Sequence, residues 1–220
     1  MTASTSVHIS PGGISYRDEI RRKLVHLSSL WMPLAMCFLP RWPLAAAFLL
    51  LFLLSLLVER ARSVRMPIVT PLYDLCFGGM LRQEPVPGQW IISGGPYVLA
   101  AAALSLGLFE APAAAAAMTT MLLGDTAAAL VGRAWGRHRT VNRKSLEGVA
   151  AFLIAGYLGA AAALALCGAP ATAYLWALAG IGPAAAAELF EKQLRFDDNF
   201  SIPLVMGCFL SIPLILEKLS

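Results

Sequence analysis

Asp125, in the run Gly124-Asp125-Thr126, is a carboxylate inside an apolar segment, about six residues or roughly 9 Å from its nearer end. An ionised carboxylate at that depth of a membrane costs about 2.5–3.5 kcal/mol on insertion scales. Residues of this kind usually face a cavity, a cation or a partner. We therefore expect Asp125 in a functional site, and the alternative is an Asp–Arg pair that locks two helices together.

Two basic groups flank this segment in the sequence. Arg22, His26 and Ser29 are spaced to share one side of a helix that runs toward the membrane, with Lys23 beside them. Lys144-Ser145 stands where a later helix begins, and a helix N-terminus offers free N–H groups and a positive dipole end to phosphate. The residues expected to hold a polyphosphate are Arg22, Lys23, Gly132, Arg133, Gly136, Arg139, Asn142, Lys144, Ser145, Glu147 and Gly148. The alternative is ordinary positive charge beside a membrane, with His26 hydrogen-bonded to a neighbour.

A fourth group is rich in side-chain oxygens. It contains Glu188, Glu191, Asp197, Asp198 and Asn199. Mg²⁺ prefers such hard ligands and is usually held by one or two carboxylates together with phosphates. We expect the metal ligands to be Asp125, Glu188, Asp198 and Asn199, and the alternative is a solvated hairpin. Basic residues together with carboxylates are the equipment of metal-dependent phosphoryl or nucleotidyl transfer.

The composition indicates which elements position these groups. Hydrophobic residues make up 58% of the 220 residues and charged residues 14%, against about 45–50% and 25% in an ordinary soluble domain. The sequence therefore predicts an all-α polytopic membrane protein and excludes a disordered or collagen-like chain. The net charge of +4 comes in short groups between apolar runs, which argues against a nucleic-acid partner. The cysteines Cys37, Cys76, Cys167 and Cys208 have no metal or redox spacing and are predicted to be apolar packing residues.

About seven transmembrane helices are predicted. Their ranges are 24–39, 44–58, 90–109, 111–131, 146–166, 171–187 and 202–216. Residues 1–23 form a cytoplasmic N-terminal segment that ends in an amphipathic helix, capped at Ser15 with Asp18 and Glu19 in its first turn. Residues 24–220 form a single transmembrane domain. The connection from Glu59 to Gln89 is predicted to be interfacial or re-entrant.

Charge sets the orientation of this arrangement. Fifteen of the 17 Lys and Arg residues fall on the side of the N-terminus, and only Arg41 and Lys218 fall on the other side. The positive-inside rule then places the N-terminus in the cytoplasm and the C-terminus outside. All four polar groups face the cytoplasm in this arrangement.

The ordered set of motifs resembles a known family. R-K-x-x-H, G-D-T-A-A-x-x-x-G-R-x-x-G, N-R-K-S-L-E-G and E…D-D-N-F-S-I-P are similar to the polyprenol kinases, which include dolichol, phytol and farnesol kinases and the yeast-type CTP-dependent diacylglycerol kinase. The resemblance implies transfer of the γ-phosphate of CTP to a lipid alcohol, with Mg²⁺ as cofactor. It implies a membrane lipid substrate, either diacylglycerol or an isoprenoid alcohol. The residues given catalytic roles are Asp125, His26, Lys144 and Glu188.

Two other functions stay open at this stage. One is a cytidylyltransferase like CDP-diacylglycerol synthase, which would release pyrophosphate. The other is a proton- or anion-coupled transporter that uses Asp125. The expected location is a bacterial inner membrane with the site facing the cytoplasm, and small-residue faces would permit a homodimer.

Overall fold

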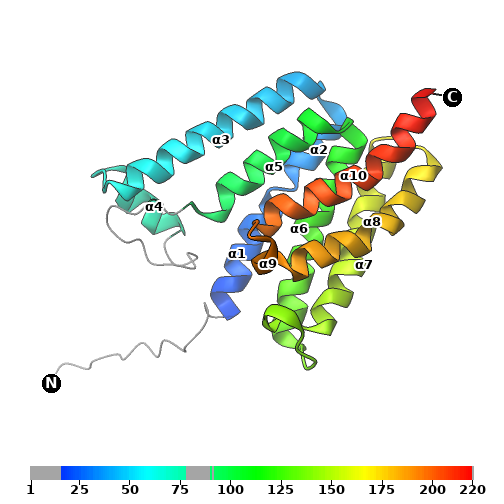
Figure 1. Cartoon of the computed structure of the whole chain (residues 1–220). Coiled ribbons are helices and arrows are strands. Elements are labelled where there is room, and N and C mark those ends of the chain that lie inside the picture. The colour runs from blue at the N-terminus through cyan, green and yellow to red at the C-terminus, as the bar shows by residue number, and fades with distance from the viewer. Residues whose placement is uncertain (1–15, 78–89, 91, 220) are drawn as a thin grey trace.

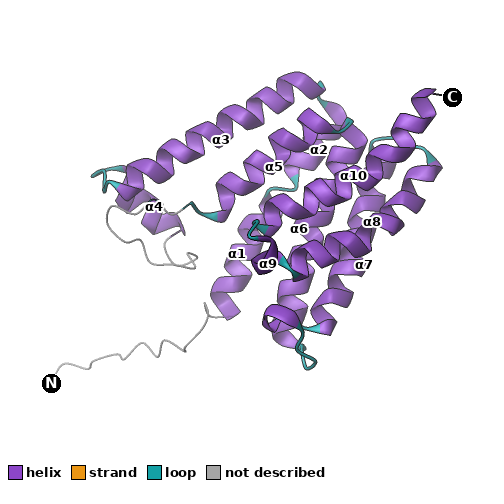
Figure 2. Cartoon of the chain, in the orientation of Figure 1, coloured by secondary structure: helices purple, strands orange, loops and turns teal. Residues whose placement is uncertain are grey.

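The computed structural model describes residues 16–77, 90 and 92–219. Within those ranges the regular structure is helical (Figure 2), and one isolated bridge pairs Arg139 with Ser145. The elements in chain order are α1 (Tyr16–Ser28), α2 (Trp31–Phe38), α3 (Arg41–Ser63), α4 (Val69–Phe77), α5 (Gly94–Leu108), α6 (Ala111–Ala134), the 3₁₀ turn η2 (Val141–Arg143), α7 (Leu146–Leu166), α8 (Ala171–Leu189), α9 (Glu191–Leu194) and α10 (Asp198–Leu219). The all-α prediction is therefore confirmed for the described residues.

Among the described residues, three helices, α3, α6 and α7, are long and apolar enough to cross a membrane. The count of seven spans and their orientation stay predictions. The predicted range 146–166 coincides with α7, while α6 and α8 run two or three residues past their predicted ends. α5 is shorter than predicted and α3 is longer at both ends.

The first predicted span, 24–39, is not one helix. The chain turns at Ser29 and Leu30 between α1 and α2, where Leu30 N–H donates to the Leu27 carbonyl at 3.0 Å. Pro33 explains the break, because it has no N–H to donate to the Ser29 carbonyl and its ring would clash there. The predicted backward extension of the helix is present, since α1 begins at Tyr16 with Asp18 and Glu19 in its first turn. The predicted cap Ser15 lies outside the described residues.

The predicted interfacial segment is only partly described. α3 continues to Ser63, and α4 follows as a short helix. Residues 78–89 of that segment, Arg82 among them, lie outside the described residues.

α6 is the central helix of the structure, and its residues from Ala113 to Met118 are fully buried. α7 packs along it, with α8 and α10 completing one group, while α3 and α5 lie side by side beyond (Figure 1). Glycines permit the close approach of α7: a Cβ on Gly156 would lie 2.8 Å from Ile181 Cδ1, and one on Gly159 would lie 2.8 Å from Leu123 Cδ1. The alanine and glycine content therefore serves tight helix packing.

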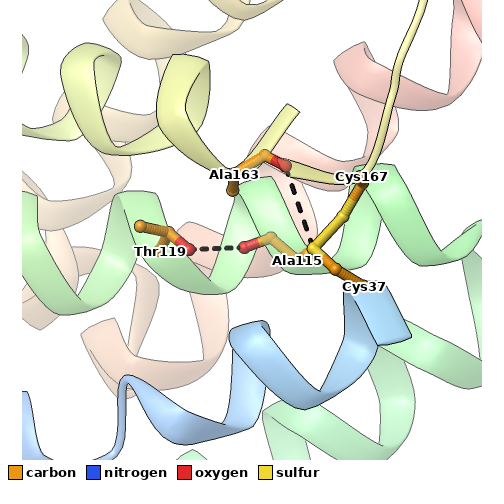
Figure 3. The surroundings of a disulfide bond; sticks show 5 residues. All are labelled: Cys37, Ala115, Thr119, Ala163 and Cys167. Carbon is orange, nitrogen blue, oxygen red and sulfur yellow. Dashed lines mark hydrogen bonds between the residues drawn. A yellow bond between two sulfur atoms is a disulfide. The ribbon is translucent and has the colours of Figure 1, made fainter. Parts of the chain in front are cut away.

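A disulfide joins Cys37, near the end of α2, to Cys167, just past the end of α7 (Figure 3). The prediction that these cysteines are merely apolar packing residues was wrong. They are 130 residues apart, so no local spacing could reveal the pair; α2 brings Cys37 beside α7, where its Sγ also lies 3.8 Å from the Ala163 carbonyl oxygen. Cys76 and Cys208 are free and exposed. The disulfide lies at the opposite end of α7 from Ser145, about 30 Å away along a 21-residue helix.

Candidate functional site

The centre of the site is a buried ion pair between α1 and α6. Lys23 Nζ donates to Asp125 Oδ2, and the two residues are only 1% and 6% exposed. His26, one turn after Lys23, places Nε2 3.4 Å from the same oxygen. Asp125 thus has a lysine partner rather than the arginine considered from the sequence. The pair joins α1 to α6 and places a buried carboxylate at their contact.

Glu19 connects the first helix to the end of α6. It is 3% exposed and accepts from Arg22, while its second oxygen lies 3.4 Å from Arg133. Burial raises the pKa of Glu19, but the hydrogen bond from Arg22 and the charges of Arg22, Lys23 and Arg133 outweigh burial and lower it. The sequence identified Glu19 only as a first-turn acid. Its role as a bridge between two predicted phosphate-binding arginines was missed.

Gly132 and Gly148 lie where α6 and α7 approach each other closely. A Cβ on Gly148 would lie 2.9 Å from the Ala128 carbonyl oxygen, and one on Gly132 would lie 3.1 Å from Ser145 Oγ. A Cβ on Gly136 would lie 2.6 Å from the same Ser145 oxygen. Ser145, 2% exposed, caps α7 by accepting from the Gly148 N–H at 3.1 Å. These glycines therefore have a packing reason to be present, and nucleotide binding at them stays a prediction.

A second ion pair lies between the α6–α7 connection and the end of α8. Lys144 Nζ lies 2.7 Å from Glu188 Oε1, also donates to the Glu188 carbonyl, and lies 3.4 Å from Glu191 Oε2. Burial lowers the pKa of Lys144, but the charge and hydrogen bond of Glu188 outweigh burial and raise it. Asn142, in the left-handed region at φ 59°, donates to the Leu189 carbonyl at 2.8 Å and supports the same junction.

Asp198 and Asn199 begin α10 and are 8% and 7% exposed. Asp197 holds the turn, because its Oδ1 accepts from the Asn199 backbone N–H at 3.0 Å and from Asn199 Nδ2 at 2.6 Å. Asp198 interacts electrostatically with the negative charges of Asp125 and Glu191. The charge of Asp198 acts in turn on Arg22 and on Lys144. Segments far apart in the sequence thus meet in one electrostatic environment.

The region contains carboxylate and amide oxygens, which are the kind of ligand that Mg²⁺ prefers. Among the described residues, no group of three or more His, Cys, Asp or Glu side chains is arranged so that it could hold a metal ion. A magnesium ion bound with a nucleotide needs only one or two carboxylates, and the phosphates and water supply the remaining oxygens. Asp198 and Asn199 offer a buried carboxylate and an amide oxygen, and Asp125 would release Lys23 to contribute a second carboxylate.

Glu147 is not brought to this centre through its side chain. It pairs with His138, whose Nδ1 lies 2.8 Å from Glu147 Oε1, and the His138 side chain is 74% exposed. Arg139 meets Ser145 through the backbone bridge. For these two residues the structure gives a loop-closing arrangement.

A polar network at the end of α3 was missed from the sequence. Glu59, 3% exposed, accepts from Tyr73 at 2.9 Å and from the Ser93 hydroxyl. Arg62 pairs with Asp74 at 2.9 Å and stacks over the Tyr73 ring. Burial is the main reason that the pKa of Tyr73 rises to about 12. The sequence did contain a signal for this network: Phe52, Leu56 and Glu59 are spaced so that they share one side of a helix, which places a carboxylate in line with apolar residues.

The chain is similar in sequence to a bacterial protein. An uncharacterized protein of Rickettsia prowazekii (strain Madrid E) is 26% identical over 186 residues, which cover 84% of this chain and 90% of the relative. No protein-family model matches the chain. No solved structure matches it either.

Proposed function

We propose that this protein is an integral-membrane lipid-alcohol kinase that transfers the γ-phosphate of a nucleoside triphosphate, CTP by resemblance, to the hydroxyl of a lipid. One observation carries the proposal: the buried Asp198 interacts electrostatically with members of two lysine–carboxylate pairs, Lys23–Asp125 and Lys144–Glu188. Phosphoryl transfer depends on positioning and on charge neutralisation, and this arrangement supplies cations and carboxylates together.

The roles divide between the two basic groups. Lys144, Ser145 and Arg133 hold the triphosphate at the start of α7, where the helix dipole favours negative charge. Lys23 and His26 approach the γ-phosphate from α1. As the ammonium of Lys23 turns to phosphate, Asp125 becomes free to take a cation or the proton of the lipid hydroxyl.

Mg²⁺, when bound, would neutralise phosphate charge and align the γ-phosphate for in-line attack. Asp198, Asn199 and Asp125 would hold it, with Glu188 beside them. Glu188 is the alternative proton acceptor, since Lys144 holds it as Lys23 holds Asp125.

We further propose seven spans and a cytoplasmic site in a bacterial inner membrane. The bias of positive charge supports this orientation. The disulfide supports it independently, because Cys37–Cys167 lies at the end of α7 remote from the basic groups, and disulfides persist in the oxidising periplasm. The Rickettsia relative supports a bacterial origin.

A transporter is the second candidate, and the Lys23–Asp125 pair is the observation that favours it. Buried ionisable pairs in membrane helices also form proton relays. A proton-coupled transporter would move its substrate in vesicles without nucleotide, and collapsing the proton gradient would stop it.

The test is a transfer assay with detergent-purified protein and Mg²⁺. γ-Labelled CTP or ATP is offered with diacylglycerol, a polyprenol or phytol, and the label is followed into lipid. We expect label in one lipid class, with CTP preferred. Absence of label in every lipid under conditions where the protein is folded would contradict the kinase proposal.

A further inference from the structure

A pocket of about 420 Å³ lies beside the candidate site, between α3, α5 and the start of α10. Its walls are mainly apolar and aromatic, and they include Phe52, Leu56, Tyr97 and Phe200. Sites for small apolar ligands have this size and this character, with a few polar groups that fix orientation.

The polar groups of this pocket lie at one side only. Arg195 and Asp197 line it where the chain enters α10. Arg195 adopts φ 56°, a left-handed conformation that a non-glycine residue rarely takes outside constrained sites.

The polar side of the pocket adjoins the candidate site through Asp197. The Asp197 carboxylate lines the pocket and also accepts both hydrogen bonds from the buried Asn199. α5 reaches the same point, since a Cβ on Gly94 would lie 3.7 Å from Asn199 Nδ2. A ligand in the pocket with a polar end at Asp197 is thus one side chain away from Asn199, which is one of the proposed Mg²⁺ ligands.

The pocket is open on one side, and a polar network fixes the position of its walls. α3 is a candidate membrane span with few buried residues, so its exposed side would contact lipid in a membrane. Beyond Leu56 on the same side of α3, Glu59 ties α3 to Tyr73 and to Ser93 at the start of α5. This network fixes the spacing of the two helices that form the apolar walls, and such preorganisation lowers the entropic cost of binding.

We propose that this pocket binds the hydrocarbon chain of the lipid substrate, with the hydroxyl end at Asp197 and Asn199. The proposal rests on the lipid-kinase function for the identity of the ligand. The lipid enters sideways from the membrane between α3 and α10, and its tail contacts Phe52, Leu56 and Phe200. The width of the pocket then determines which lipid alcohols are accepted.

The test uses a long-chain alcohol with a diazirine in its chain, added to the full-length protein in lipid nanodiscs without nucleotide. Photolysis followed by peptide mass spectrometry should place the label on α3, α5 and the start of α10. Leu56→Trp fills the pocket and should remove this labelling. Leu57→Trp is the matched control, because Leu57 is the next residue of the same helix and is 64% exposed.

Kinetics supply a second readout. Leu56→Trp should raise the KM for the lipid by about tenfold or more and leave the KM for CTP nearly unchanged, as expected for loss of lipid binding alone. Leu57→Trp should change neither value. Labelling that is spread over exposed helix faces, or that Leu56→Trp does not reduce, would overturn the pocket assignment.

The two proposals fail in different ways. Pocket labelling that Leu56→Trp removes, without phosphate transfer to any lipid, would support the pocket and contradict the kinase. Phosphate transfer with an unchanged lipid KM in Leu56→Trp would support the kinase and contradict the pocket.

Discussion

Replacing the two members of the Lys23–Asp125 pair, singly and together, tests whether the pair only holds α1 against α6 or whether Asp125 also takes part in catalysis. Both side chains are buried, so each single replacement leaves the other partner buried without its counter-charge. Removing one partner of a buried pair costs about 3–5 kcal/mol. For a chain of this size, each kcal/mol lowers Tm by about 2–4 °C, so Lys23→Met and Asp125→Asn should each lower Tm by about 6–20 °C.

The double variant carries the decisive information. Lys23→Met combined with Asp125→Asn leaves no uncompensated charge, and replacing a whole buried pair with neutral groups is often nearly neutral. We expect its Tm to return to within a few degrees of the wild-type value. Phosphate transfer should remain absent, because no carboxylate is left at position 125.

Thermal unfolding followed by circular dichroism, and γ-phosphate transfer measured on the same preparations, give the two readouts. A double variant that regains both stability and transfer would refute the catalytic role of Asp125 and leave only the helix lock. Single variants with unchanged Tm would refute the buried ion pair itself.

Three further predictions concern packing, pH and the disulfide. Gly148→Ala should destabilise the protein by about 1–3 kcal/mol, because its Cβ would lie 2.9 Å from a carbonyl oxygen, whereas Gly182→Ala, with nothing within 4 Å, should not; denaturation of both variants checks this. Because surrounding cations lower the pKa of Glu19 below 4.5, its contribution is complete above pH 4.5 and is lost as the pH falls through the lowered pKa, so the Tm difference between wild type and Glu19→Gln should shrink in acid. Replacing Cys37 and Cys167 together with serine should lower stability by about 2–4 kcal/mol, and a reductant should lower the Tm of the wild type only.

Local patterns predicted most of the helices and singled out Asp125, Lys23 and His26, which the structure brings together. The apolar range 146–166 coincides with α7, and the helical spacing of Lys23 and His26 indicated that they lie close together on α1. These features depend on helix periodicity and on the cost of burying charge, which a sequence displays directly.

Features that depend on which helices meet could not be predicted. The choice of Lys23 as partner of Asp125 requires knowing that α1 packs on α6. The Cys37–Cys167 disulfide depends in the same way on α2 lying beside α7. The hydrogen bonds of Glu59 could not be predicted for the same reason, because its partners come from α4 and from the start of α5.

The break before α2 was missed for a different reason. Pro33 is the third residue of α2, and proline is tolerated in the first turn of a helix. The apolar pattern of the sequence continues across the break, so the pattern alone did not reveal it. The predicted span therefore joined two helices that are separate in the structure, because Pro33 cannot donate to the Ser29 carbonyl, which accepts from the Met32 N–H at 2.9 Å instead.

The most direct test of the central claim follows both ends of the nucleotide in one reaction. Purified protein with Mg²⁺ receives either γ-labelled or α-labelled CTP, with the lipid alcohol in one reaction and phosphatidate in another. We predict that γ-label appears in the lipid alcohol and that α-label remains in water-soluble CDP. α-Label in the lipid formed from phosphatidate, with release of pyrophosphate and no γ-label in the alcohol, would identify a cytidylyltransferase and contradict the kinase assignment.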